Sequence, residues 1–146
     1  MNHSATSPSL LDPLERVVIG SVGVTAAAVA DAAPDLTLLQ WRVVVVLAAA
    51  DDGMPVSDLA RRLRSSVPAM SRLLSRLRSR GIVEARKDRP DGRVTTVVLG
   101  ESGRTLWARV SARRRDDLVA ALEDASLGTG DAAVLDRLAT AFEAYA

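Results

Sequence analysis

The chain has 146 residues, a net charge of +1 and 48% hydrophobic residues, which is enough apolar material for one folded domain. It contains no cysteine, which excludes disulfides, thiolate zinc sites and thiol redox sensing, and its one histidine, His3, lies in a polar N-terminal stretch where a metal or catalytic site is not expected. Residues 1–9 do not have the pattern of a secretory signal, and the most apolar run, residues 43–50, is too short to span a bilayer, so a cytoplasmic protein without membrane contact is expected.

The first predicted element is a long amphipathic helix. Leu11, Leu14, Val18 and Val22 recur at spacings of three and four, which is the pattern of a helix with one apolar face. The helix is predicted to continue to residue 33, where Pro34 ends it. Residues 1–9 before it are expected to form a flexible tail.

The second helix is predicted to be the central buried element. Thr37 and Gln40 have the T-x-x-Q spacing of a capping box, which satisfies free N–H groups at a helix start. The residues up to position 50 are apolar on nearly every side, so this helix is expected to lie in the core. Asp51, Asp52 and Gly53 then close it with a turn.

Two short helices follow, joined by a tight turn. Residues 54–56 are predicted to be extended, and Ser57 is predicted to be the N-cap of a helix over residues 58–64. Ser65 and Ser66 provide the turn and the next N-cap, and Pro68 lies in the first turn of the following helix, where its missing N–H has no consequence. That helix is predicted to reach residue 80 and to bury one face, formed by Met70, Leu73, Leu74 and Leu77.

A β-hairpin and two more helices complete the chain. Residues 82–87 and 93–99 are predicted strands rich in β-branched residues, and residues 88–92 between them have a turn composition. A long helix is predicted over residues 101–122, followed after the break at Gly128 and Gly130 by a helix that Asp131 caps and that ends at Tyr145. The predicted order is ααβααββαα, a mainly α fold with a small β-hairpin wing (α+β).

Positive charge is concentrated in one window of the sequence. Eleven of the nineteen basic residues lie between Arg61 and Arg93, where there are three acidic residues, so this window carries +8. The remaining eight basic and fifteen acidic residues carry −7, and the two parts give the net +1. Such a window is expected of a surface that faces a polyanion.

The arrangement of these residues indicates double-stranded DNA as the polyanion. Two short helices and a tight turn followed by a β-hairpin form a winged helix-turn-helix, whose second helix fits a major groove about 12 Å wide. Arg72 and Arg76, one turn apart on the exposed face, are candidates to bind guanine edges, and Ser65 and Ser66 to bind phosphates. Arg89 at the hairpin tip and Arg93 at its end are candidates to bind in the neighbouring minor groove or to its phosphates.

The sequence resembles the MarR family of winged helix-turn-helix transcriptional regulators over about residues 11–146. The resemblance is carried by an ordered series of motifs: LxQWRV at residues 38–43, VSDLA at 56–60, VPAMSRLLSRL at 67–77, GIV at 81–83, DxxDxR at 88–93, VxL at 97–99 and ESGR at 101–104. Gly100 replaces the threonine that usually caps the long fifth helix, and Ser71 stands where threonine is common. Because glycine is a tolerable N-cap, the first departure is not expected to change the fold.

This resemblance implies a homodimer that holds two recognition helices about one DNA turn apart. Residues 34–100 would form the winged helix-turn-helix, and residues 10–33 with 101–146 the helical dimerisation region. The dimer-interface candidates are Leu11, Leu14, Val18, Leu135, Leu138 and Phe142. Their alternative role is packing within one chain. We favour the dimer, because apolar side chains on terminal helices are typically buried against a partner surface.

The site candidates follow from the motifs and the resemblance together. The DNA-binding candidates are Ser57, Ser65, Ser66, Pro68, Ala69, Arg72, Arg76, Arg89 and Arg93, and Asp91 is expected to fix the shape of the wing. Trp41 and Arg42 are candidates for a pocket that binds a small aromatic or anionic effector, with core packing and pairing to an acid of the first helix as the alternatives. Arg113 is expected to pair with nearby acids one helical turn away rather than to bind DNA.

Two other classes of function fit the sequence less well than a DNA-binding repressor. A winged-helix module that binds proteins without specific DNA binding would more often expose an apolar patch than a charge of +8 on the recognition helix and wing. An enzyme is disfavoured because the folded part has no histidine or cysteine, no Gly-rich phosphate loop and no paired-carboxylate motif. No cofactor and no metal are expected.

Overall fold

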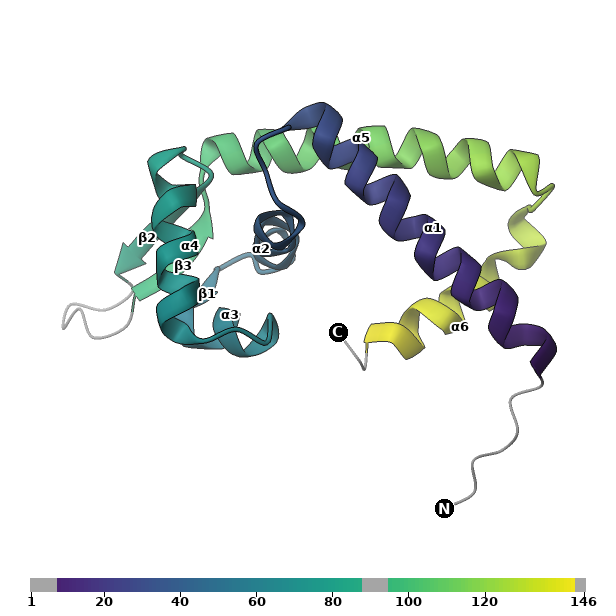
Figure 1. Ribbon diagram of the computed structural model, residues 1–146, viewed down its shortest axis with the longest axis horizontal. Helices are drawn as coiled ribbons and strands as arrows, with labels where there is room; N and C mark the ends of the chain where they lie inside the picture. The colour runs from purple at the N-terminus through teal and green to yellow at the C-terminus, as the bar shows by residue number, and fades with distance from the viewer. Residues whose placement is uncertain (1–7, 88–94, 144–146) are drawn as a thin grey trace, which may run out of the picture.

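The computed structural model describes residues 8–87 and 95–143 and shows a mainly helical chain with one small sheet (Figure 1). The elements in chain order are α1 (Pro8–Ala32), α2 (Leu38–Ala48), β1 (Met54–Pro55), α3 (Val56–Arg62), α4 (Val67–Ser79), β2 (Val83–Lys87), β3 (Thr95–Leu99), α5 (Glu101–Asp124), the short 3₁₀ helix η1 (Thr129–Asp131) and α6 (Ala132–Glu143). The predicted order and fold class are therefore confirmed.

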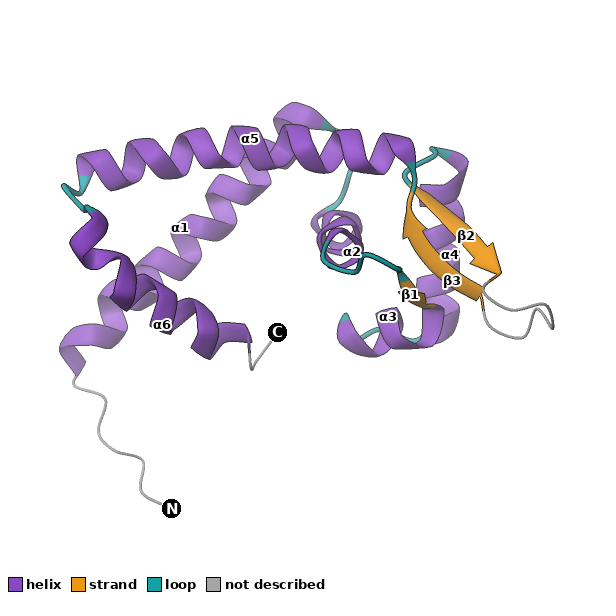
Figure 2. Cartoon of the chain, turned by 180° about the vertical axis from the view of Figure 1, so that it is seen from behind, coloured by secondary structure: helices purple, strands orange, loops and turns teal. Residues whose placement is uncertain are grey.

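The sheet is antiparallel, and its strand order is β1-β3-β2. β2 pairs with β3 along its whole length, from Val83 opposite Leu99 to Lys87 opposite Thr95, and β1 adds Met54 opposite Val97. The extended segment predicted before α3 is thus the third strand of the sheet. Together with α2, α3 and α4, the sheet forms a compact lobe at one end of the molecule (Figure 2).

Helix α2 lies at the centre of this lobe. Trp41, Val43, Val44 and Leu47 are all buried, as its apolar sequence predicts, and they pack in one cluster with residues of α3, α4, the sheet and α5. The predicted capping box is present, because the Gln40 backbone N–H donates to Thr37 Oγ1 at 3.2 Å and the Thr37 N–H donates to Gln40 Oε1 at 2.8 Å. This cap satisfies two backbone N–H groups at the start of the helix.

The turn after α2 depends on a glycine. Gly53 has φ of +74°, and a Cβ there would overlap the carbonyl oxygen of Val97 and approach Val98 Cγ1 at 2.5 Å. The turn therefore lies directly on β3, which no other residue type would allow without a shift of the backbone. In this way the end of α2 is held against the sheet.

Two predicted helix caps are wrong. Ser57 is not an N-cap: α3 begins one residue earlier, at Val56, with Pro55 in the N-cap position and no side-chain cap. Asp131 does not cap α6 directly, because it ends the 3₁₀ helix η1 and its carboxylate accepts a hydrogen bond from the Gly128 N–H at 3.0 Å. In both places the chain becomes helical before the expected capping residue.

Three helices extend away from the lobe as an arm (Figures 1 and 2). The first part of α5 packs on the lobe through Leu106 and Val110, and α1 packs against α5 through its C-terminal half, where Ala28 and Val29 are buried. The rest of α1, the second half of α5 and all of α6 expose many large apolar side chains.

The C-terminal end of α1 is attached to α5 by two arginines. Arg109 donates a hydrogen bond to the carbonyl oxygen of Ala32, and Arg113 pairs with Asp31 at 3.4 Å and with Asp117 at 2.8 Å. The pair with Asp117 is the predicted i,i+4 contact. Cationic groups at the C-terminal end of a helix also interact favourably with its dipole.

By length and composition, residues 10–32 of α1 form the one helix among the described residues that could cross a membrane, and few of them are buried. This stretch was missed in the sequence because its apolar residues are distributed along the helix rather than in one run. Asp12, Glu15, Arg16 and Asp31 lie within it. Four ionisable residues are more typical of a helix that packs on another protein surface than of a membrane span.

Two helical glycines provide a test of the packing between α5 and the lobe. A Cβ on Gly103 would overlap the carbonyl oxygen of Ile82, whereas a Cβ on Gly23 of α1 would meet no atom of the chain within 4 Å. We expect Gly103→Ala to lower the free energy of unfolding by about 2 kcal/mol or more, because the backbone must move. Gly23→Ala should leave it unchanged or raise it by up to about 1 kcal/mol. Urea unfolding followed by circular dichroism measures both, and equal effects would show that α5 does not pack on Ile82 as described.

Candidate DNA-binding surface and an adjoining cavity

The turn between α3 and α4 is held by backbone hydrogen bonds and a buried leucine. Leu63 ends α3 and is 5% exposed, and the Ser65 N–H donates to the carbonyl oxygen of Ala60 at 2.8 Å. Arg64 has φ of +51°, a left-handed conformation that is uncommon for a residue other than glycine. The turn therefore fixes the angle between the two helices while the Arg64 side chain remains exposed.

Helix α4 begins with the predicted cap. Ser66 has extended backbone angles, and its Oγ accepts a hydrogen bond from the Ala69 N–H at 3.3 Å. Pro68 lies in the first turn, where it interrupts no helical hydrogen bond. Ser66 and Pro68 are exposed, and Ser65 and Ala69 are half-buried, so the start of α4 forms an accessible surface.

The two faces of α4 have opposite character. Met70, Leu74 and Leu77 are buried and Leu73 is half-buried, in agreement with the predicted apolar face. Of the residues predicted for the other face, Arg72, Ser75, Arg76 and Ser79 are exposed and Ala69 is half-buried. The buried face fixes the helix in the lobe, and the exposed face presents guanidinium and hydroxyl groups.

Arg72 and Arg76 lie together beside the start of α2. They line a shallow hollow of about 280 Å³ whose other walls include Thr37, Leu39 and Gln40. Within residues 8–87 and 95–143 neither arginine has a carboxylate partner, whereas Arg61 on α3 pairs with Asp58 at 2.8 Å. Arg72 and Arg76 therefore present positive charge that the described part of the chain does not neutralise.

The structure brings together seven of the nine predicted DNA-binding residues on α3, the turn and α4. These are Ser57, Ser65, Ser66, Pro68, Ala69, Arg72 and Arg76. Ser57 is exposed in the first turn of α3 rather than at its cap. The predicted wing residues Arg89, Asp91 and Arg93 lie outside the described residues.

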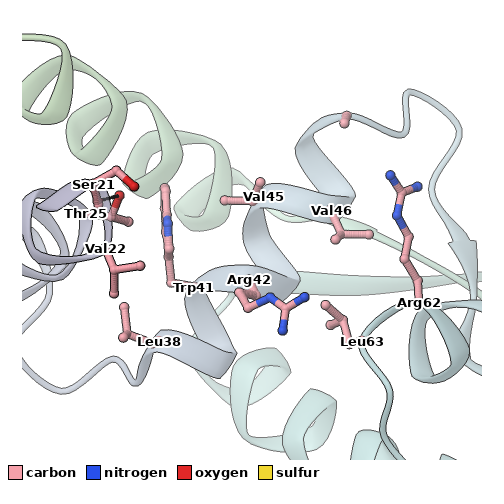
Figure 3. A pocket seen from close by; sticks show the side chains of 11 residues that line it. Ser21, Val22, Thr25, Leu38, Trp41, Arg42, Val45, Val46, Arg62 and Leu63 are labelled. Atoms are coloured by element: carbon pink, nitrogen blue, oxygen red, sulfur yellow. Dashed lines mark hydrogen bonds between the residues drawn. The ribbon is translucent and has the colours of Figure 1, made fainter. Parts of the chain in front are cut away.

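A cavity of about 410 Å³ lies between α1 and the lobe, and both predicted pocket residues line it (Figure 3). Trp41 is 2% exposed, and its indole stands beside Ser21 and Thr25 of α1. Arg42 is exposed and extends along the cavity toward Leu63. Trp41 therefore packs in the core and also lines the cavity.

Three polar residues of this cavity were missed in the sequence. Arg62 of α3 lines it together with Arg42, and the lining residues include no acid. Ser21 and Thr25 of α1 also line it, although their hydroxyls donate to carbonyl oxygens of their own helix at 2.8 and 2.9 Å. The i,i+4 spacing of Ser21 and Thr25 within an apolar helix is the one signal in the sequence that could have indicated them.

Four of the predicted dimer-interface residues border one groove on the arm. Leu11, Leu14 and Val18 of α1 and Phe142 of α6 line it. The other two, Leu135 and Leu138, lie on α6, where Leu135 is 46% exposed and Leu138 is half-buried. Packing within one chain therefore leaves these side chains largely uncovered.

The chain is similar to known proteins in sequence over its lobe and in structure over its whole length. The sequence profile of the MarR family matches residues 35–94, which is less than half of the chain, and no curated protein sequence matches. Among solved structures, RV1404 from Mycobacterium tuberculosis is 22% identical with a TM-score of 0.79, and the match covers 98% of this chain and 97% of that one.

Two further structures have similar folds. A MarR family protein from Bacillus stearothermophilus is 20% identical with a TM-score of 0.79 and is matched over 99% of this chain and 97% of its own. NadR in complex with 4-hydroxyphenylacetate is 21% identical with a TM-score of 0.69 and is matched over 97% of both chains. Residues 35–94 therefore match the model of the MarR family, and the whole chain has the fold of solved MarR family proteins.

Proposed function

We propose that this protein is a sequence-specific, double-stranded-DNA-binding transcriptional regulator, a homodimeric repressor and not an enzyme. The observation that carries the proposal is the exposed face of α4, where Arg72 and Arg76 lie without carboxylate partners among the described residues. A helix of about 10–12 Å diameter fits the major groove of B-DNA. A guanidinium can bind guanine O6 and N7 at two points, so these side chains are suited to read bases.

The surrounding residues suit contacts to the DNA backbone. The Ser66 Oγ accepts from the Ala69 N–H, which leaves the hydroxyl proton available for a phosphate oxygen. Ser57, Ser65, Pro68 and Ala69 would approach the same strand at the starts of α3 and α4. We further propose that Arg89 and Arg93 bind in or beside the minor groove and that Asp91 orients the wing. These contacts position the protein, whereas Arg72 and Arg76 provide the sequence preference.

A second copy of the chain is the proposed partner of the arm. The groove bordered by Leu11, Leu14, Val18 and Phe142 is apolar and exposed, and contiguous apolar surface of this kind is typical of an interface. A dimer with two-fold symmetry would bury it and place two α4 helices about one DNA turn apart. The matching operator would be an inverted repeat of about 16–20 base pairs, and its occupation would block a promoter.

A small aromatic or anionic effector is the proposed ligand of the cavity beside Trp41. Its two arginines, Arg42 and Arg62, and the absence of any acid from its lining suit a carboxylate, and the indole suits a ring. The solved NadR complex contains 4-hydroxyphenylacetate, which has both features. Because the cavity lies between α1 and the lobe, a bound effector would change the position of the lobe relative to the arm and release the operator.

We propose a cytoplasmic location without membrane contact. DNA binding requires access to the chromosome, and the apolar face of α1 would be covered by the second copy rather than by lipid. No cofactor or metal has a role in this mechanism.

Arg72→Ala is the test of base reading. On DNA that carries the operator, the loss of one two-point contact should weaken binding by about 1–3 kcal/mol and relax the preference at one base position. Fluorescence anisotropy with the DNA upstream of the gene and a scrambled duplex, at several salt concentrations, measures this. Arg61→Ala is the matched control, because Arg61 already pairs with Asp58, and it should have a smaller effect. Equal loss on both duplexes would contradict base reading, and no binding by the unmodified protein at low salt would favour a protein-binding module instead.

Phe142→Asp is the test of the dimer. A charge in the apolar groove cannot be buried without a partner, so we expect the variant to be monomeric at micromolar concentration. Light scattering after size-exclusion chromatography gives the mass. Thr140→Asp places the same charge on the other side of α6 and should remain dimeric. A dimeric Phe142→Asp variant would show that the interface lies elsewhere.

Arg42→Gln is the test of the effector cavity. If the cavity binds 4-hydroxyphenylacetate, removal of one charged hydrogen-bond donor should raise the dissociation constant about tenfold or more. Isothermal titration calorimetry measures it, with the neutral 4-hydroxyphenylacetamide as the ligand control. Equal affinity of the variant and the unmodified protein would remove Arg42 from the proposed binding site.

A further inference from the structure

Trp107 occupies a position that neither the core nor the proposed interface explains. On α5, Trp107 is 41% exposed, whereas Trp41 is 2% exposed. It lies on the half of α5 that packs on the lobe, between the buried residues Leu106 and Val110. An indole is a large apolar group, so its exposed part offers an apolar surface on which a ligand can pack.

The indole forms one wall of a second cavity, of about 430 Å³. The end of α2 contributes Leu47 and Ala48 to this cavity, and the turn after α2 contributes Asp51. The sheet contributes Arg86 and Val98, and α5 contributes Arg104 and Trp107. None of its lining residues belongs to the cavity beside Trp41. The volume is in the range of pockets that bind small molecules.

Two arginines line this cavity together with Trp107. Arg104 Nη1 donates to the carbonyl oxygen of Leu99 at 2.7 Å, which holds the side chain in place and leaves its other N–H groups free for a ligand. Arg86 lies on β2 and is exposed. In the part of the chain that the structure describes, neither arginine is within ion-pair distance of a carboxylate. The cavity thus combines a planar apolar wall with two planar cationic groups.

We propose that this second cavity is a binding site for a small aromatic monocarboxylate, distinct from the proposed effector cavity. The ring would lie against Trp107, and the carboxylate would bind Arg86 and Arg104, because a carboxylate matches the planar donor pair of a guanidinium. Asp51 also lines the cavity, and its negative charge disfavours a dianion such as a phosphate monoester. The charges of Arg86, Arg104 and Asp51 add to +1, which one carboxylate neutralises.

The two tryptophans of the chain allow each cavity to be followed separately in the unmodified protein. Trp41 lines the first cavity and Trp107 the second, so the two indole N–H signals of ¹⁵N-labelled protein report on one cavity each. Trp107→Phe assigns the signals. Titration with 4-hydroxyphenylacetate should shift the Trp107 signal in a saturable way, and 4-hydroxyphenylacetamide at the same concentrations should not.

Two opposite variants distinguish a direct contact from a distant effect. Arg86→Gln should weaken the binding that the Trp107 signal reports about tenfold and leave the Trp41 curve unchanged. The Arg86 side chain is exposed and has no ion-pair partner among the described residues, so its replacement should leave the fold intact. Asp51→Asn should tighten the same binding severalfold, a gain that misfolding cannot produce.

The result that overturns this proposal differs from the result that overturns the effector cavity. The second site is excluded if the Trp107 signal does not shift at millimolar 4-hydroxyphenylacetate, or if it shifts equally with 4-hydroxyphenylacetamide. It is also excluded if, in both variants, the Trp107 and Trp41 signals give the same dissociation constant. A silent Trp41 signal with a responsive Trp107 signal excludes the effector cavity instead and leaves the second site in place.

Discussion

Burial of the apolar face of α2 that carries Trp41, Val43, Val44 and Leu47 is the interaction on which the other elements depend. Helix α5, strand β3 and the C-terminal part of α1 contact it, and Trp41, Val43, Val44 and Leu47 are each at most 3% exposed. Each such side chain contributes about 1.5–3 kcal/mol when it is fully buried. Because the lobe is built around this helix, the angle of α4 and the position of the sheet are fixed relative to the same support.

Helix α2 borders the hollow beside Arg72 and Arg76 and both proposed ligand cavities. Its first turn, with Thr37 and Gln40, lies beside Arg72 and Arg76 of α4. Its middle, with Trp41 and Arg42, lines the cavity that faces α1, and its end, with Leu47 and Ala48, lines the cavity that contains Trp107. A closely packed interior transmits small displacements rather than absorbing them. A ligand in either cavity would therefore act on the helix that supports the arginines of α4.

The elements and their faces could be predicted from the sequence because they depend on local patterns. The spacing of Met70, Leu74 and Leu77 predicted the buried face of α4, and the pair Thr37 and Gln40 predicted the start of α2. The Ser57 cap was wrong because Val56 is already helical in the packed lobe, which is a tertiary effect on a helix of two turns. Local patterns identify an element better than they identify its first residue.

The cavities could be predicted only in part, because their walls come from distant parts of the chain. Trp41 and Arg42 are adjacent in sequence and were identified, whereas Arg62 is brought to the same cavity by the packing of α3. The second cavity joins residues from α2, the sheet and α5, and no spacing in the sequence relates Asp51 to Arg104 and Trp107. The exposure of Trp107 could not be predicted from the sequence either, because an isolated tryptophan is equally typical of a core.

Helix α5 connects the lobe to the other two helices of the arm, α1 and α6. It spans 24 residues, so it is about 36 Å long. Gly103 seats its first turn against Ile82, and Arg109 and Arg113 attach α1 near its middle. A tilt of about 5° at the seat would move the far end of a helix of this length by about 3 Å. Because Arg109 and Arg113 attach α1 to α5, α1 would follow that movement. In the proposed dimer, the distance between the two α4 helices would therefore depend on the angle at which Gly103 packs against the carbonyl group of Ile82.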